Sequence, residues 1–383
     1  DMNIQNQLQQ AVDNNLAAYT EKSSEGVYSM QGAATCVDNS TGNVVAIVGS
    51  RSQEDIKGYV LNRAYQSYRQ PGSCIKPLNV YTPYLQLGNT PDTKVTDSQI
   101  DGGAVKWSKN TVAWNIYQQI TPKTGSSFLI KMGFHKIWVD KDYNAGALGG
   151  FTYGVTTEEM AGGYAALAND GVYRKATCIR LIVNASNKTV VNETNRDSKV
   201  YDKSASRMMT QMLREVVLSG TGTSANVENA VVAGKTGTTN ASKDVWFCGY
   251  SKYYTTTVWA GYDYPKEMSG VNSRVNAIFK DFMTAVHTNL PVTDFSTVTQ
   301  QTTQPETTAA VQEETESLPQ ETTAIVPETT GIEQVTPQQV PSTTAQVPTT
   351  TPYQRWTTAP AQPKTTAPMQ YGDIDATTRT DPD

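Results

Sequence analysis

The chain has 383 residues, which is enough for one or two domains with a sizeable core, and its formal net charge is −5. Residues 301–383 contain 22 Thr, 11 of the 18 Pro, and 11 acidic against 3 basic residues, so the first 300 residues carry about +3. That excess is too small to indicate a nucleic-acid-binding protein. There is no run of 18 apolar residues that would predict a membrane span, and the four cysteines lack the C-x-x-C spacing of a zinc or redox site.

The first predicted elements are a helix and a hairpin. Residues 4–22 place apolar side chains at helical spacing, and residues 32–49 form two β-rich runs around the turn sequence "NSTG". From about Pro71 to Gly220 the periodicity is helical, with a predicted capping box at Thr156 and Glu159.

Strand patterns return in the last third of the globular part. "AVVAGKTGTT", "DVWFCGYS" and "YYTTTVWAGYD" are separated by short turns that suit antiparallel neighbours, and a last helix is predicted over residues 276–290. Strands at both ends with helices between them predict one α+β domain, whose antiparallel sheet is assembled from the two ends of the chain.

The Thr- and Pro-rich end of the chain predicts a disordered, extended stalk. Repeats such as "QETTAIVPETT" have no apolar periodicity and no core-forming density. A docking site that uses Tyr353 and Trp356 is the alternative interpretation. The sequence thus divides into a linker-type helix (1–26), a globular domain (27–292) and a tail (293–383).

The two histidines do not indicate a catalytic base. His135 and His287 each lie among apolar or aromatic residues typical of packing, and neither is in an H-E-x-x-H pattern. An activated serine would then need another base, and lysine is the obvious candidate.

The sequence "RQPGSCIKPL" offers such a pair. If a helix starts after Pro71–Gly72, Ser73 and Lys76 share a face about 5–6 Å apart, whereas Cys74 points to the packing side. Free N–H groups in the first helical turn would suit an oxyanion. Pro77 disfavours helical geometry at the lysine, a kind of local conflict that is common at functional sites.

As a base, Lys76 would need its pKa lowered from about 10.4 to roughly 7–8, through burial and a second positive charge. Taken alone, the S-x-x-K spacing is a weak signal, and it fits an N-cap serine and a solvated lysine better than a catalytic pair.

Two further sequences could complete a site. "KTGTT" at residues 235–239 offers a cation, hydroxyls and a glycine that allows close approach, which would suit a substrate carboxylate lying along a strand. An ordinary edge strand is the alternative, while a phosphate-binding loop is excluded because position 229, where it requires glycine, is asparagine. Ser108 could relay protons, and the Asn110 amide could hold a lysine and a substrate carbonyl.

Taken together, the three motifs are those of the penicillin-recognising serine enzymes. The surrounding sequences "NRAYQSYRQPGSCIKPL", "LGGFTYGVTTEEMAGGYAALANDGVY" and "GKTGTTNASKDVWFCGYS" closely resemble the transpeptidase domain of class A penicillin-binding proteins. The resemblance runs from about residue 5 to 290. It implies a central antiparallel sheet flanked by helices, with an inserted, mostly helical subdomain.

The resemblance also implies a role for each motif residue. Ser73 would be the acylated nucleophile and Lys76 its base. Ser108 would pass the proton to the leaving amine, Asn110 would position the substrate, and Lys235 would supply positive potential.

The rest of the implied site binds the substrate. Thr236, Gly237 and Thr238 would hold its carboxylate end, and the backbone N–H groups of Ser73 and Thr238 would form the oxyanion hole. No cofactor or metal is implied. The implied acyl donor is a peptidoglycan stem peptide ending in D-Ala-D-Ala, and the implied acceptor is the amine of a neighbouring strand. β-Lactams are the implied inhibitors of the enzyme. The implied location is the extracytoplasmic face of the bacterial membrane or the cell wall, and we expect the sequence as given to be soluble.

The sequence departs from the family pattern in three respects. We expect it to lack the N-terminal glycosyltransferase domain and membrane anchor of a full-length relative. "DSQIDGGAVKWSKN" lacks a stretch rich in Pro, Asn and Tyr, and Cys74 replaces a small polar residue. The alternatives are a D,D-carboxypeptidase, a β-lactamase, or a non-catalytic sensor of β-lactams or muropeptides. A β-lactamase would need a deacylating carboxylate, and Glu158 and Glu159 look like helix-cap residues.

Overall fold

The structure, a computed structural model, describes residues 1–298 except for residues 54–59, 96–97, 100–102, 180 and 193–196. The predicted tail beyond residue 298 therefore lies outside the described residues, as does part of the segment before Ser108 that departs from the family pattern.

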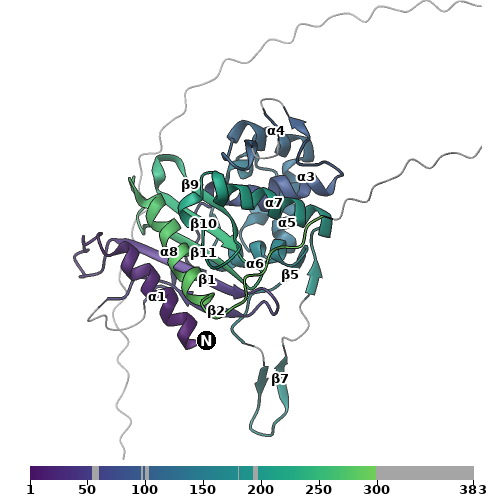
Figure 1. Cartoon of the computed structure of the whole chain (residues 1–383). Coiled ribbons are helices and arrows are strands. Elements are labelled where there is room, and N and C mark those ends of the chain that lie inside the picture. The colour runs from purple at the N-terminus through teal and green to yellow at the C-terminus, as the bar shows by residue number, and fades with distance from the viewer. Residues whose placement is uncertain (54–59, 96–97, 100–102, 180, 193–196, 299–383) are drawn as a thin grey trace, which may run out of the picture. The chain divides into compact units, whose positions relative to one another are not determined.

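The central element is a five-stranded antiparallel sheet in the order β2-β1-β11-β10-β9. Its strands are β1 (Met30–Asp38), β2 (Val44–Val48), β9 (Ala233–Thr238), β10 (Asp244–Tyr250) and β11 (Tyr254–Tyr262). β1 pairs with β11, so the N-terminal hairpin lies beside the last strand that the structure describes (Figure 1). The prediction of a sheet assembled from both ends of the chain is confirmed.

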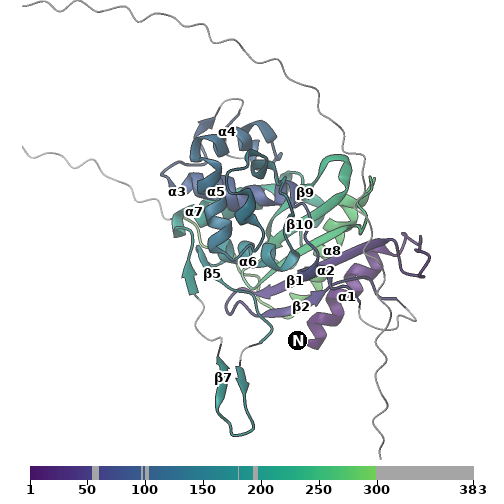
Figure 2. The same cartoon turned by 180° about the vertical axis from the view of Figure 1, so that it is seen from behind.

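Helices cover both faces of this sheet. α1 (Met2–Leu16) and α8 (Val271–Val286) lie against one face, and α6 (Thr157–Ala168) lies against the other, as Figures 1 and 2 show from opposite sides. Asp1 caps the N-terminus of α1, since its carboxylate accepts hydrogen bonds from two first-turn N–H groups. Its buried residues recur at helical spacing, which confirms the predicted amphipathic helix: Leu8, Ala11, Val12 and Leu16.

A mostly helical part is inserted between β2 and β9. It contains α2 (Arg63–Gln66), α3 (Thr82–Gln86), α4 (Asn110–Ile120), α5 (Pro122–Lys131), α6 and α7 (Lys203–Ser219). The predicted capping box is present, since Thr156 and Glu159 exchange side-chain and backbone hydrogen bonds at the start of α6.

This inserted part is less uniformly helical than predicted. It also contains three small two-stranded ladders: β3 (Lys94–Val95) with β4 (Ser98–Gln99), β5 (Val172–Arg174) with β8 (Asp197–Lys199), and β6 (Leu181–Val183) with β7 (Thr189–Asn192). The β6–β7 hairpin has β-branched residues on both sides of the turn-forming sequence "NASN", a strand pattern that the helical interpretation overlooked.

After α8 the described chain continues along the domain. Thr293 hydrogen-bonds to the Tyr253 hydroxyl at 2.8 Å, and Asp294 pairs with Arg214 at 2.9 Å. The Phe295 ring meets Tyr250 edge-on, with centroids 5.4 Å apart. Residues 293–298, which the sequence interpretation assigned to the tail, thus include several contacts with the domain. None of the described helices combines the length and apolarity needed to cross a membrane.

Candidate active site

The Ser73–Lys76 pair lies on a tight helical turn. Gly72–Ile75 forms a 3₁₀-helix, and Pro77–Tyr81 follows as a π-helix that leads into α3. Residues three apart in a 3₁₀-helix eclipse each other, so Ser73 and Lys76 share one side of the turn. The sequence predicted a regular helix here. Pro77 has no N–H to donate, and it marks the change from one helix type to the next.

Lys76 links the first motif to the second. Its side chain is fully buried, and Nζ donates to the Ser108 carbonyl at 3.0 Å and to Asn110 Oδ1 at 2.7 Å. Asn110 is the first residue of α4, while Ser108 has a positive φ of 57°, which costs backbone strain in a residue other than glycine. The loop before α4 is thereby bent so that a backbone oxygen faces the lysine.

The two buried lysines have lowered pKa values. Burial, followed by the nearby positive charge of Lys235, lowers the pKa of Lys76 from 10.5 to about 7. Burial lowers the pKa of Lys235 to about 8. A lysine with a pKa near 7 is substantially neutral at physiological pH, as a general base must be. The structure therefore provides both influences that the sequence argument required for Lys76.

The third motif lies on β9, which is one of the two edge strands of the sheet. Lys235 pairs with Cys248 across the β9–β10 ladder, and the backbone N–H of Thr239 donates to Asp244. Because successive residues of a strand point their N–H groups to opposite sides, the N–H of Thr238 points away from β10, towards the open edge.

Glycines bring the edge strand β9 against the turn that carries the candidate nucleophile Ser73 (the nucleophile turn, Gly72–Ile75). A Cβ on Gly237 would lie 2.5 Å from the Pro71 carbonyl oxygen and 2.8 Å from Cys74 Sγ. Gly72 has a φ of +50°, and a Cβ there would lie 2.9 Å from the Thr238 carbonyl oxygen. Only residues without a Cβ allow this approach, which places Ser73 beside the third motif.

Cys74 belongs to the packing side of this junction. It is fully buried, and its Sγ donates to the Lys235 carbonyl at 3.1 Å. Its own carbonyl accepts a 2.7 Å hydrogen bond from the Tyr164 hydroxyl. Ser73, by contrast, is only partly buried. Cys74 is thus engaged with β9 and α6.

Sequence reasoning missed several residues that hold the turn. Gly149 has a φ of +80°, and a Cβ there would lie 2.2 Å from the Gly72 carbonyl oxygen. The indole N–H of Trp246 donates to the Gln70 carbonyl at 2.8 Å. Because these partners are distant in sequence, spacing could not reveal them, although Gly149 lies within one of the stretches that carry the family resemblance.

The two histidines and Glu159, which could also act as bases, have structural partners. His287 is buried, with its ring nitrogens at hydrogen-bond distance from the Ser251 hydroxyl and the Met283 carbonyl. His135 is largely exposed and pairs with Glu159 at 3.0 Å. That glutamate also completes the capping box, which confirms it as a helix-cap residue.

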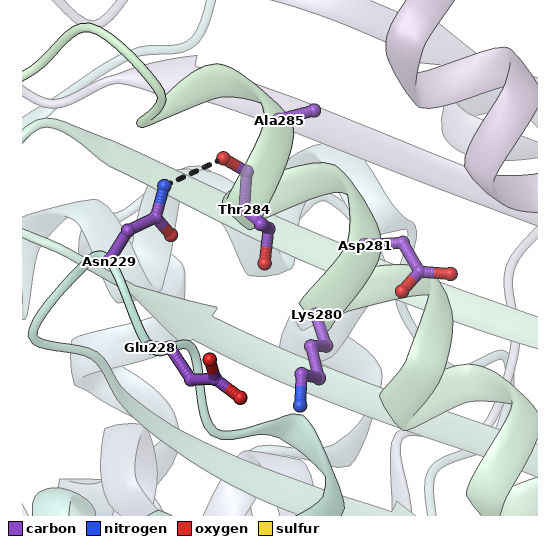
Figure 3. Close-up of a pocket in the computed structure, with 6 residues that line it drawn as sticks. All are labelled: Glu228, Asn229, Lys280, Asp281, Thr284 and Ala285. Carbon is purple, nitrogen blue, oxygen red and sulfur yellow. Dashed lines mark hydrogen bonds between the residues drawn. The ribbon is translucent and has the colours of Figure 1, made fainter.

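The pocket in Figure 3 lies away from the three motifs. It has a volume of about 500 Å³ and is lined by residues of α8 and of the loop before β9: Glu228, Asn229, Lys280, Asp281, Thr284 and Ala285. Asn229 donates to the Thr284 carbonyl across it at 3.0 Å. We do not consider it the active site, because its lining includes none of the motif residues. Among the residues that the structure describes, no cluster of three or more His, Cys, Asp or Glu side chains could hold a metal.

Comparison with known proteins identifies the family. The profile of the penicillin binding protein transpeptidase domain matches residues 32–103 and 101–284. The chain belongs to this family, and its curated relatives place it with the transpeptidase domains of class A penicillin-binding proteins.

Two relatives illustrate the extent of the match. The chain is 32% identical to penicillin-binding protein 1A of Clostridium acetobutylicum, over 76% of this chain and 40% of that protein. It is also 32% identical to penicillin-binding protein 4 of Bacillus subtilis, over 64% of this chain and 42% of that protein. The chain thus spans less than half the length of these relatives.

Solved structures share the fold. The PonA1 protein of Mycobacterium tuberculosis, in complex with penicillin V, has a TM-score of 0.61 at 21% identity, covering 76% of this chain and 86% of that one. A peptidoglycan glycosyltransferase from Burkholderia ambifaria has a TM-score of 0.59 at 20% identity, covering 76% of this chain and 98% of that one.

Proposed function

We propose that this chain is a serine D-Ala-D-Ala transpeptidase domain, which cross-links peptidoglycan stem peptides through an acyl-enzyme on Ser73 and is acylated by penicillin. The observation that carries the proposal is the position of Lys76, buried on the same side of the turn as Ser73 and hydrogen-bonded to Asn110. Its pKa of about 7 makes it a base that can work at neutral pH.

In the first half of the reaction, Ser73 Oγ attacks the carbonyl carbon of the penultimate D-Ala while Lys76 takes its proton. The backbone N–H groups of Ser73 and Thr238 stabilise the oxyanion that forms. Two features support this role: Ser73 lies in a first helical turn, and the Thr238 N–H faces the open edge of β9. As the peptide bond breaks, Ser108 delivers a proton to the leaving terminal D-Ala.

In the second half, the amine of a neighbouring stem peptide attacks the ester on Ser73. Its proton returns through the same residues, a new peptide bond forms, and Ser73 is regenerated. Lys235 supplies positive potential to the substrate carboxylate, and the hydroxyls of Thr236 and Thr238 donate to it. The location that follows from this substrate is the extracytoplasmic face of a bacterial membrane.

The test is turnover of a pentapeptide ending in D-Ala-D-Ala, with and without an added acceptor amine. We expect D-Ala release together with an aminolysis product when the amine is present, and neither in Ser73→Ala. Release of D-Ala with hydrolysis alone, whatever the amine concentration, would indicate a carboxypeptidase. Penicillin labelling without any peptide turnover would indicate a sensor.

A further inference from the structure

In the third motif, the hydroxyls of Thr236 and Thr238 each contact a side chain outside the three motifs. Thr236 Oγ1 lies 2.7 Å from Thr221 Oγ1, and the Thr238 hydroxyl donates to Asn272 Oδ1 at 2.9 Å. Thr221 follows the end of α7, and Asn272 is in the first turn of α8. Two separate elements therefore reach the two hydroxyls.

A hydroxyl has one proton and two lone pairs. If it is to donate that proton to a carboxylate, any other partner must donate to its oxygen. The Thr221 hydroxyl can do so directly, because either oxygen of the Thr221–Thr236 pair can be the donor. The Asn272 amide can do so after a half-turn about its last side-chain bond, which exchanges its oxygen for an NH₂ group.

We propose that Thr221 and Asn272 are positioning residues for carboxylate recognition. Each donates to a threonine oxygen, so that the protons of Thr236 and Thr238 are both directed at the ligand's carboxylate. This inference rests on the proposed function, in which those two threonines bind the carboxylate. It adds that their direction of donation is set by residues outside the family motifs.

The surroundings of Thr221 suit this role. Its backbone N–H donates to the Lys106 carbonyl at 3.2 Å, in the loop that leads to Ser108. The preceding Gly220 approaches so closely that a Cβ would lie 2.6 Å from that same carbonyl oxygen. Thr221 therefore joins the loop of the second motif to the strand of the third, and its backbone is anchored where its hydroxyl reaches Thr236.

The surroundings of Asn272 also suit an anion. It belongs to a helix of 16 residues, Val271–Val286, and its contact with Thr238 places the start of that helix beside the third motif. The partial positive charge at a helix N-terminus favours a carboxylate nearby. The side-chain NH₂ of Asn272 would add a directed hydrogen-bond donor to the partial positive charge of the helix N-terminus.

The test compares acylation by benzylpenicillin with acylation by its methyl ester, which lacks the carboxylate. Thr221→Val should slow acylation by the penicillin about tenfold or more, because a charge-assisted hydrogen bond is weakened, and should affect the ester little. Thr221→Ser keeps the hydroxyl and should retain the wild-type preference for the penicillin over its ester. Thr223→Val, two residues further along, is the matched control and should leave the preference unchanged.

The amide is tested with an isosteric change. Asn272→Asp can only accept from Thr238 and adds a negative charge, so it should reduce the preference for the carboxylate more than Asn272→Ala does. An equal loss with both ligands, or an Asn272→Asp variant with the wild-type preference, would overturn the inference alone. Failure of benzylpenicillin to acylate the wild-type chain would overturn the proposed function and, with it, this inference.

Discussion

Lys76 Nζ and Asn110 Oδ1 are joined by a 2.7 Å hydrogen bond between residues 34 positions apart in the sequence. This contact ties the nucleophile turn to the start of α4 and fixes the direction of the lysine side chain. Burial lowers the pKa of Lys76. The hydrogen bond to Asn110 gives the buried amine a polar partner, so the group is not left unsatisfied.

The pH dependence of acylation follows from the two lysines. We expect the rate of penicillin acylation to rise with pH through about 7, as Lys76 becomes the neutral base. It should fall through about 8, as Lys235 loses the charge that attracts the carboxylate. Stopped-flow acylation measured across this range would check the resulting bell shape.

Two substitutions separate the limbs of that profile. Lys235→Gln removes the positive charge that helps lower the pKa of Lys76, so the acid limb should move to higher pH. Lys235→Arg keeps a charge at every pH tested, so the alkaline limb should disappear. An acid limb that stays at the same pH in Lys235→Gln would show that burial alone lowers the pKa of Lys76.

Gly149→Ala should impair the site through the nucleophile turn. A Cβ at this position would lie 2.2 Å from the Gly72 carbonyl oxygen, so the turn that carries Ser73 must move. Acylation should fall at least about tenfold, which corresponds to about 1.4 kcal/mol in the activation barrier.

Gly26→Ala is the matched control for that change. Gly26 has a φ of +77°, close to the +80° of Gly149, but an added Cβ would meet no atom within 4 Å. Both variants carry the backbone strain of a positive φ, about 1–2 kcal/mol, and only one displaces the turn. Equal acylation rates in the two variants would contradict the importance of this close approach.

Truncation should distinguish two parts of the predicted tail. A chain that ends at Val298 keeps Phe295 against Tyr250 and Asp294 beside Arg214, and its melting temperature should match that of the full chain. A chain that ends at Val292 loses both contacts and should melt about 2–4 °C lower. Because neither contact involves a motif residue, the acylation rate should be the same in both. Equal melting temperatures would mean that residues 293–298 do not stabilise the domain.

Local patterns in the sequence predicted much of this arrangement. The β1–β2 hairpin follows from alternating β-rich runs around a turn, and the start of α6 follows from the capping box at Thr156. The shared face of Ser73 and Lys76 follows from a spacing of three in a helical turn. These features depend on neighbours within a few residues, so they can be read from the sequence.

Contacts between distant segments could not be predicted in the same way. Asn272 meets Thr238 across 34 residues, and Gly149 meets Gly72 across 77. These contacts are set by how β9, α8 and the nucleophile turn pack in three dimensions, and no local periodicity encodes that packing. The change from 3₁₀- to π-helix at Pro77 is a local feature, but a spacing of three between Ser73 and Lys76 fits a regular helix equally well.

The most direct test of the central claim is to map the penicillin adduct by tandem mass spectrometry. Trypsin does not cleave before Pro77, so the peptide from Gln70 to Lys94 carries both Ser73 and Cys74, and fragmentation must separate them. We expect the penicilloyl group on Ser73, no adduct in Ser73→Ala or Lys76→Ala, and labelling retained in Cys74→Ser, whose hydroxyl can replace the thiol donor to the Lys235 carbonyl. An adduct on Cys74, or labelling that persists in Ser73→Ala, would contradict serine acyl transfer in this chain.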